Sequence, residues 1–294
     1  MSIMGNELAA PNVEDPILLL RSVEEEIPDD EIPIFRLFAA TLQYPADSIT
    51  IAAKLASDID FVCHAEAASE RMEDVIMYIW MQLIQIAHCV PPEHPWVDCL
   101  VQTIEILRGQ DGLVPGMGRA GLWSNLPYFG QVMYEKMDEY SPVIDPNATV
   151  SERMLTGWKT LNTFAIKLTR NPIQWFGFPL HSMRWALEEP LAKGDLQSCR
   201  LWVACKWVVA HADGMHAHVV ARRADEGASA DHSLQPGELC GDSASPLGDD
   251  RWEYWGKQLQ AQQDDSASLG IDEETVRLVS VAIEKVYAVL GRKS

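Results

Sequence analysis

The fold is decided by the stretch from Thr149 to His218, which reads TVSERMLTGWKTLNTFAIKLTRNPIQWFGFPLHSMRWALEEPLAKGDLQSCRLWVACKWVVAHADGMHAH. Its apolar residues recur every three or four positions through three consecutive segments. This is the period of one face of an α-helix, because neighbours on that face are separated by about one turn. The stretch therefore predicts three helices with short breaks between them.

Local signals set the expected ends of these helices. Thr149 and Ser151 are both candidate caps for the first, since a hydroxyl can accept from a free N–H of the first turn. The second is expected over residues 173–193, where Gly194 supplies a left-handed stop. Asp195 is then in place to cap the third, which runs toward His218.

Tryptophan is concentrated in this stretch. Five of the ten tryptophans of the chain lie in it, and they are Trp158, Trp175, Trp185, Trp202 and Trp207. Burying rings of this size needs a thick core. Further helices must therefore cover the three predicted here.

The remainder of the chain supplies such helices and no strand pattern of useful length. Helical periodicity or capping signals occur over residues 16–23, 34–43, 48–60, 67–88, 94–108, 123–140, 250–263 and 272–290. We predict an all-α fold: a single helical bundle of about nine to eleven helices over residues 16–294. Residues 1–15 are expected to be a flexible N-terminus. Residues 222–249, rich in Ala, Asp, Ser, Gly and Pro, are expected to be a low-complexity insertion that is disordered or lightly ordered.

Composition restricts the possible partners. The formal charge of −20 repels nucleic acid and anionic membranes. No window approaches the length of apolar chain that crosses a bilayer, and the first fifteen residues do not form a signal peptide. Six cysteines without a CxxC pair are expected to be reduced, buried thiols. These features predict a cytoplasmic protein with no nucleic-acid partner and no membrane span.

Several blocks of the stretch resemble a known family. The blocks are Trp158-x-x-Leu161-Asn162-x-Phe164-Ala165-x-x-Leu168, Ala186-Leu187-Glu188 and Ala204-x-x-Trp207, with Leu122-Trp123-x-x-Leu126-Pro127 upstream. Together they are similar to a fungal family catalogued only as a domain of unknown function. Lys159 and Thr160 depart from it, since an acidic or amide residue is expected there, and Thr163 replaces a small alanine. The resemblance implies an all-helical, intracellular fungal protein and supplies no agreed activity.

Five polar or amphipathic side chains on these otherwise apolar helices are candidate ligand-binding residues: Asn162, Arg184, Glu188, Lys206 and Trp207. One interpretation is structural, with Arg184 and Glu188 forming an i, i+4 ion pair and Asn162 bonding to the backbone nearby. The other is that all five face a substrate pocket between helices, where such sites are commonly built.

Two motifs contain possible metal ligands. His211-x-Asp213-x-x-His216-x-His218 combines imidazole and carboxylate, which suits Zn or Fe, although histidines near a helix C-terminus also stabilise its dipole. The second motif, Asp264-Asp265-x-x-Ser268-x-x-x-Asp272, resembles the second Mg²⁺ motif of terpene cyclases, with Asp in place of the final Glu. Gly270 interrupts it, and Asp272 is also suited to cap the last helix.

These observations leave three hypotheses for function. The first is a protein of fungal specialised metabolism, most specifically a noncanonical, Mg²⁺-dependent prenyl-diphosphate cyclase, which is a carbon–oxygen lyase. The second is a noncatalytic carrier or regulator that binds a small apolar molecule in the same central pocket. The third is an acidic helical module that binds a protein partner.

Overall fold

The computed structural model describes residues 16–25, 27–29, 31–68, 70–118, 121–141, 150–169, 177–222, 235–241 and 248–291. Within these ranges the chain is helical, and its only β-type pairing is an isolated bridge between Leu113 and Leu122. The predicted all-α fold is confirmed.

The elements of the first half are α1 (Pro16–Glu24), α2 (Ile32–Leu42), α3 (Ser48–Glu66), α4 (Met72–His88), α5 (Pro95–Arg108), the 3₁₀ turn η2 (Trp123–Asn125) and α6 (Phe129–Glu139). Those of the second half are α7 (Glu152–Leu168), α8 (Gly177–Leu187), α9 (Asp195–Arg222), α10 (Asp249–Asp264), α11 (Ser266–Leu269) and α12 (Glu273–Val289). The described ranges thus hold twelve α-helices. This exceeds the expected range by one, because a single separate turn, α11, follows α10.

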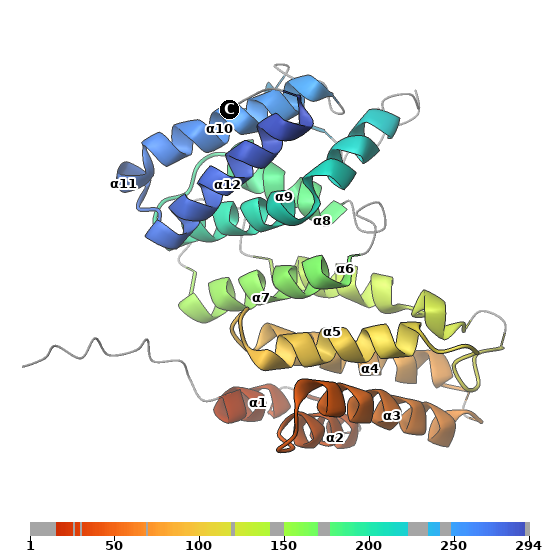
Figure 1. Cartoon of the computed structure of the whole chain (residues 1–294). Helices are drawn as coiled ribbons and strands as arrows, with labels where there is room; N and C mark the ends of the chain where they lie inside the picture. The colour runs from red at the N-terminus through yellow and green to blue at the C-terminus, as the bar shows by residue number, and fades with distance from the viewer. Residues whose placement is uncertain are drawn as a thin grey trace, which may run out of the picture.

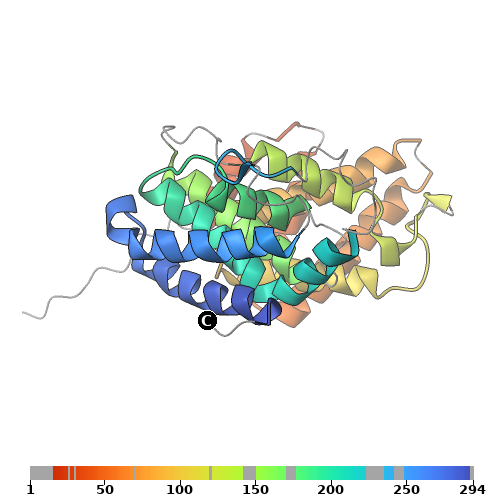
Figure 2. The ribbon, with the colours of Figure 1, turned by 90° about the horizontal axis from the view of Figure 1, so that it is seen from above.

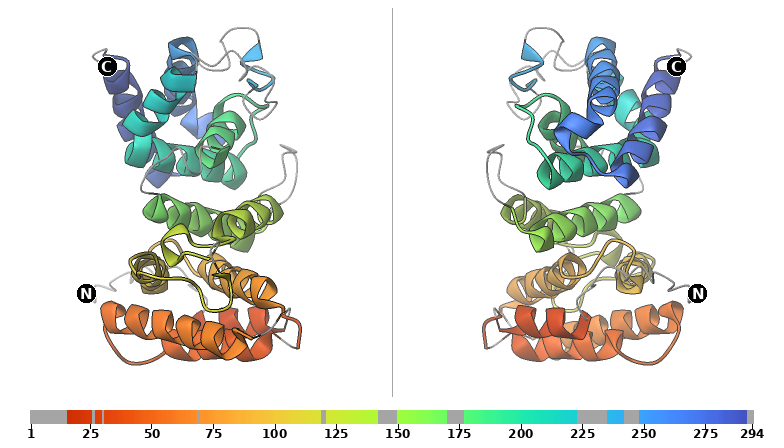
Figure 3. Two further views of the ribbon diagram at one scale, coloured as in Figure 1. Left: turned by 90° about the vertical axis from the view of Figure 1, so that its right-hand side faces the viewer. Right: turned by 90° about the vertical axis from the view of Figure 1, so that its left-hand side faces the viewer.

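The helices are stacked in successive layers (Figures 1 and 3). α1, α2 and α3 form one end, followed by α4 with α5, α6 with α7, and α8 with α9, while α10 and α12 form the other end. The principal contacts follow this order: α3 packs on α5, α4 and α5 pack on α7, α7 packs on α9, and α9 packs on α12. Figure 2, seen from above, shows α10 and α12 side by side over the layers beneath them.

The expected tryptophan-rich core is present. Trp158, Trp202 and Trp207 are buried, while Trp185 is partly buried. Trp175 lies outside the described residues. The core continues into the N-terminal layers, where the buried Trp80 indole donates to the carbonyl of Pro127 at 2.7 Å. A buried indole N–H needs such a partner, and this one ties α4 to the turn before α6.

Sequence signals placed several helix ends correctly. Ser151 caps α7 by accepting from the N–H of Met154, and Asp272 caps α12 by accepting from that of Thr275. Thr149, the alternative cap for α7, lies outside the described residues. Gly194 has the predicted left-handed conformation, with φ of 61°. Asp195 differs from its predicted role, because it is already the first residue of α9.

Two helix lengths differ from the predictions. α8 ends at Leu187 rather than reaching residue 193, because Pro190 disfavours helix in the residue before it and has no N–H to continue the ladder. α9 passes Gly214 and continues to Arg222 with a kink at His211, where φ is −137°. Since Ala212, Met215 and Val219 are buried, packing offsets the cost of about 1 kcal/mol that a glycine imposes on a helix interior.

The predicted insertion at 222–249 is partly described. Residues 235–241 form turns in which Gly237 and Cys240 are buried, and the N–H of Leu239 donates to the carbonyl of Glu188 at 2.7 Å. These seven residues are therefore held against the end of α8 by hydrogen bonds to Glu188. The six cysteines, all described, are free and buried as predicted.

In the part of the chain that the structure describes, none of the helices combines the length and the apolar character that a membrane crossing requires.

Candidate functional site

Asn162 and Trp207 form a buried link between α7 and α9. The Asn162 amide donates from Nδ2 to the carbonyl of Trp158 at 2.9 Å, which confirms the predicted backbone bond. Its Oδ1 accepts from Trp207 Nε1, also at 2.9 Å. Both side chains are completely buried. The pair therefore satisfies polar groups inside the core and lines neither of the cavities described below.

The predicted ion pair between Arg184 and Glu188 is wrong. Arg184 Nε instead donates to Glu189 Oε1 at 2.6 Å, in a partly exposed pair. Glu188 follows the last residue of α8, and its N–H still donates to the carbonyl of Arg184 at 2.8 Å, but its carboxylate accepts from Arg251 of α10 instead of the Arg184 side chain. Its side chain turns into the core.

Glu188 is the centre of a buried polar network. Its carboxylate accepts from Arg251 Nε at 2.7 Å, from Arg251 Nη2 at 2.9 Å and from Trp255 Nε1 at 2.6 Å. The backbone N–H of Gly237 donates to it at 2.7 Å. Glu188 is 0% and Arg251 1% exposed, so the pair is shielded from water and compensates its own charge. The network joins α8, residues 235–241 and α10.

Lys206 lies over an aromatic ring and does not line the cleft described below. Its Nζ is 4.7 Å from the centroid of the Trp202 ring, and Lys159 Nζ is 5.3 Å from the same centroid. Trp202 Nε1 donates to Glu274 at 3.0 Å. The indole is thus held from three directions, by α7, α9 and α12.

The two predicted Mg²⁺ carboxylates lie at the exposed C-terminal end of α10. Asp264 accepts from Gln260 at 3.0 Å, and Asp265 is the residue between α10 and α11. Gly270 has a left-handed conformation and Asp272 caps α12, so the motif does not continue along one helix. Among the described residues, no group of three or more His, Cys, Asp or Glu side chains is arranged to hold a metal ion.

The histidine motif is divided by the kink in α9. His211 Nε2 is 3.2 Å from the carbonyl of Ile166, whereas His216 Nε2 pairs with Asp249 at 2.8 Å. A small hollow of about 170 Å³ lies beside His211 and Asp213, with Lys285 of α12 on its edge. α9 does not end at Gly214 but continues to Arg222, with non-helical backbone angles at His211.

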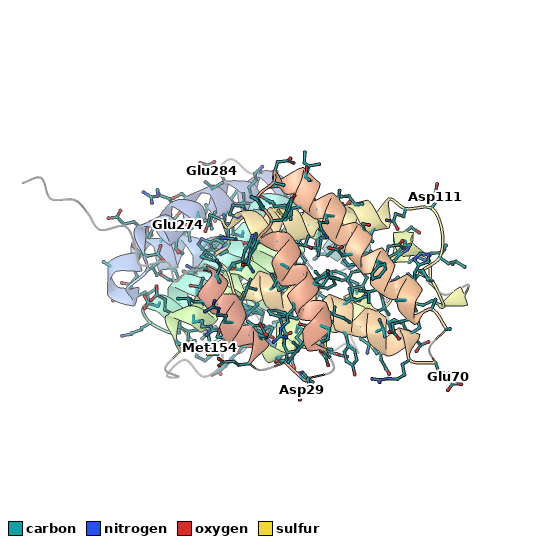
Figure 4. All side chains as sticks on the ribbon, turned by 90° about the horizontal axis from the view of Figure 1, so that it is seen from below. Asp29, Glu70, Asp111, Met154, Glu274 and Glu284 are labelled. Carbon is teal, nitrogen blue, oxygen red and sulfur yellow. The ribbon has the colours of Figure 1, made fainter. Side chains whose placement is uncertain are left out.

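A larger cleft, of about 670 Å³, opens where α1, α4, α7, α9 and α12 meet. α7 contributes Glu152, Arg153, Thr156, Gly157 and Lys159. The other elements contribute Leu19, His88, Cys89, Pro91, Pro92, Glu93, Trp202 and Glu274. Figure 4, seen from the α1–α3 end, places Glu274 and the α7 residue Met154 on the same side of the molecule. None of the seven predicted binding or metal residues lines this cleft.

Gly157 allows α7 to approach the end of α4 closely. A Cβ at this position would come within about 3 Å of three atoms of the His88 imidazole, closer than such atoms approach in proteins. The imidazole also stacks on Tyr140, with ring centroids 4.0 Å apart. Burial, with a smaller contribution from the Arg153 guanidinium, lowers the pKa of His88 to about 4. The ring is therefore neutral near pH 7 and a weak base.

Burial favours the protonated form of the thiol in the cleft. Burial raises the pKa of Cys89 to about 12, and its Sγ donates to the carbonyl of Ile86 at 3.2 Å. Because the thiolate is the nucleophilic form, this residue is not prepared for covalent chemistry at neutral pH.

The two cations of the cleft both come from α7. Arg153 donates from Nη2 to the hydroxyl of Ser22 at 2.8 Å, and Lys159 lies over Trp202. Within the described part of the chain, neither forms an ion pair with a carboxylate. The sequence did not predict either cation as a binding residue, although Lys159 stands out because it departs from the family pattern. The cleft residues come from five helices that are distant in sequence, so no local motif contains them.

The fold and this cleft define the molecule as a layered, all-helical protein with a mixed polar and apolar cleft between its layers. A family model described as Protein of unknown function (DUF3632) matches residues 80–259, which is more than half of the chain, and the protein belongs to that family. No curated protein and no solved structure matches the chain.

Proposed function

We propose that this protein is a noncatalytic ligand-binding protein whose cleft takes an apolar organic molecule carrying a single negative charge. The observation that carries this proposal is the pair of cations, Arg153 and Lys159, beside an apolar wall and without ion pairs in the described part of the chain. A guanidinium and an ammonium in a partly enclosed site favour carboxylate or phosphate oxygens as partners.

The apolar part of the cleft lining suits a hydrocarbon. Leu19, Pro91, Pro92 and Trp202 contribute apolar surface. The cleft volume of about 670 Å³ lies in the usual range for organic ligands, which is roughly 300–1,000 Å³. An amphipathic ligand would place its apolar part here and its charged group near α7.

The charge of the cleft favours a monoanion over a diphosphate. Glu93, Glu152 and Glu274 also line it, so its carboxylates outnumber its two cations. Glu274 is fixed by the Trp202 indole, which keeps this negative charge at the cleft. A ligand with about three negative charges would be repelled more strongly than one with a single charge.

The ionisable groups of the cleft support binding rather than catalysis. His88 is a weak base because its pKa is about 4, and the Cys89 thiol stays protonated because its pKa is about 12. Asp264 and Asp265, on which the cyclase hypothesis depends, lie at the C-terminal end of α10 and do not line the cleft. No observation in the described cleft favours prenyl-diphosphate cyclisation over binding alone.

The test is calorimetric titration of the purified protein with decanoate and with farnesyl diphosphate, the latter with and without Mg²⁺. We expect decanoate to bind, and Arg153→Gln and Lys159→Gln each to weaken binding by about tenfold or more, since a hydrogen bond to a charged group contributes roughly 1.5–3 kcal/mol. Lys257→Gln, on the exposed face of α10, is the matched control and should bind as the unchanged protein does.

Two results would overturn the proposal. Equal binding by the control and both α7 variants would place the ligand outside the cleft. Mg²⁺-dependent release of diphosphate and formation of a hydrocarbon from farnesyl diphosphate would show that the protein is a cyclase.

A further inference from the structure

The hydroxyl of Thr156 differs from those of the threonines that follow it along α7. Thr160 and Thr163 each donate to the carbonyl four residues earlier, at 3.0 Å and 2.9 Å. Thr169, directly after the helix, does the same at 2.7 Å. Among the described residues the hydroxyl of Thr156 has no partner, and this residue lines the cleft. Partly buried hydroxyls ordinarily form a hydrogen bond, so this one is free to bind a ligand.

The imidazole of His88 is a second polar group without a partner in the cleft. The ring takes the position that a side chain at residue 157 would occupy, because Gly157 has none. One face of the ring stacks on Tyr140. Neither ring nitrogen forms a hydrogen bond with another residue that the structure describes. Because its pKa is low, the ring is neutral near pH 7, and a neutral imidazole offers one donor and one acceptor.

Both groups lie near Arg153. Thr156 follows Arg153 by three residues, so the two side chains are neighbours on the surface of α7, about 4.5 Å apart along the helix axis. Gly157, against which His88 packs, is the next residue, and α4 lies in the layer beside α7 (Figure 1). All four residues line the cleft. The cleft therefore has two neutral hydrogen-bonding groups close to a cation that favours a carboxylate.

We propose, on the basis of the function proposed above, that the ligand is a hydroxylated fatty acid. Its carboxylate binds Arg153, and a hydroxyl on its third carbon binds Thr156 and His88. A hydroxyl both donates and accepts, which matches two neutral partners that can each do the same. A second charged group on the ligand would need a charged partner, which neither Thr156 nor His88 supplies.

The spacing on α7 determines where the hydroxyl lies on the ligand. Arg153 and Thr156 are less than one helical turn apart, so the hydroxyl must be close to the carboxylate. A hydroxyl at the opposite end of the carbon chain lies away from both Thr156 and His88. It would lose its bonds to water on entering an apolar part of the cleft, which weakens binding.

Calorimetric titration of the full chain with three acids tests this inference: decanoate, 3-hydroxydecanoate and 10-hydroxydecanoate. We expect 3-hydroxydecanoate to bind about fivefold more tightly than decanoate, since a net hydrogen bond strengthens binding by roughly two- to tenfold. The matched control is 10-hydroxydecanoate, which has the same atoms and should bind no more tightly than decanoate.

Single variants test the two residues. Thr156→Val removes the hydroxyl with little change of shape and should make the affinities for decanoate and 3-hydroxydecanoate nearly equal, while Thr156→Ser should keep the preference. His88→Phe keeps a ring to stack on Tyr140 but lacks both nitrogens, so it should also reduce the preference. Thr163→Val is the matched control, because the Thr163 hydroxyl bonds to the carbonyl of Lys159 and the residue does not line the cleft.

The outcomes separate this inference from the proposed function. If none of the three acids binds, the proposed function fails, and the assignment of the hydroxyl fails with it. If decanoate binds and 3-hydroxydecanoate binds no more tightly, the proposed function stands and the assignment of the hydroxyl is overturned. A preference for 3-hydroxydecanoate that Thr156→Val and Thr163→Val retain equally also overturns it, and this comparison does not depend on whether His88→Phe folds.

Discussion

Glu188 and Arg251 lie 63 residues apart in the chain and form a completely buried ion pair, in which the Arg251 Nε donates to Glu188 Oε1 at 2.7 Å. The carboxylate also accepts from Trp255 and from the backbone of Gly237. One side chain therefore holds together three segments of the C-terminal layers.

Removing one partner of this pair should destabilise the protein strongly. Glu188→Ala leaves a buried guanidinium without its carboxylate, and such changes lower the free energy of unfolding by about 3–5 kcal/mol. We expect the double variant Glu188→Ala, Arg251→Met to be more stable than Glu188→Ala alone, because the uncompensated charge is gone. Urea unfolding measures both values. A single variant that loses less than about 1 kcal/mol would contradict this role.

The half-exposed pair of Arg184 and Glu189 provides the control for that measurement. Its side chains are 30% and 14% exposed, so water screens the interaction more than it screens the buried pair. Glu189→Gln should therefore lower the free energy of unfolding by no more than about 1 kcal/mol.

The contrast between these two pairs shows what the sequence predicts and what it does not. Helical spacing correctly predicted the existence of α7, α8 and α9, because periodicity is a local property of the chain. The same spacing predicted an ion pair between Glu188 and Arg184, because a local pattern reveals only partners within one helix. Arg251 is distant in sequence, and the contact appears only when α8 and α10 pack together.

The cleft was missed for a related reason. Arg153 and Lys159 are exposed or partly exposed residues on a helix whose apolar stripe was predicted correctly, and charged residues on such a face are ordinary. They become notable only because α1, α9 and α12 surround them. By contrast, Asn162 and Trp207 attracted attention as polar groups on apolar helices, and the structure shows that they hydrogen-bond to each other.

That hydrogen bond predicts a second stability effect. Asn162→Ala should leave the buried Nε1 of Trp207 without an acceptor, which lowers the free energy of unfolding by about 1–3 kcal/mol. In a double-mutant cycle with Trp207→Phe, the double variant should lose less free energy of unfolding than the sum of the two single losses. The reason is that phenylalanine has no N–H donor that needs the Asn162 oxygen. Strictly additive values from urea unfolding would show that the two side chains do not act as a pair.

Gly157 predicts an effect of close packing. Gly157→Ala adds a Cβ that meets the His88 ring, and overpacking of this kind costs about 1–3 kcal/mol although alanine is the better helix former. His88→Ala with Gly157→Ala should recover stability relative to Gly157→Ala alone, because the small side chain leaves room. If Gly157→Ala is as stable as the unchanged protein in thermal unfolding, the close approach of α4 and α7 is not as the structure shows.

The lowered pKa of His88 predicts how stability depends on pH. Its pKa is about 4 in the folded protein and 6.5 ordinarily, so between these values the unfolded chain binds the proton first. The stability from the neutral ring is complete above about pH 6.5 and is lost as pH falls toward 4, by up to about 3 kcal/mol.

The variant His88→Asn cannot take up this proton. It should therefore remove most of the dependence of the free energy of unfolding on pH in this range. Burial also lowers the pKa of His94, so a smaller dependence of stability on pH should remain in the variant. Unfolding in urea at intervals from pH 7.5 to 4 measures the difference between the two proteins. Parallel curves across this window would show that His88 is not held in its neutral form by the fold.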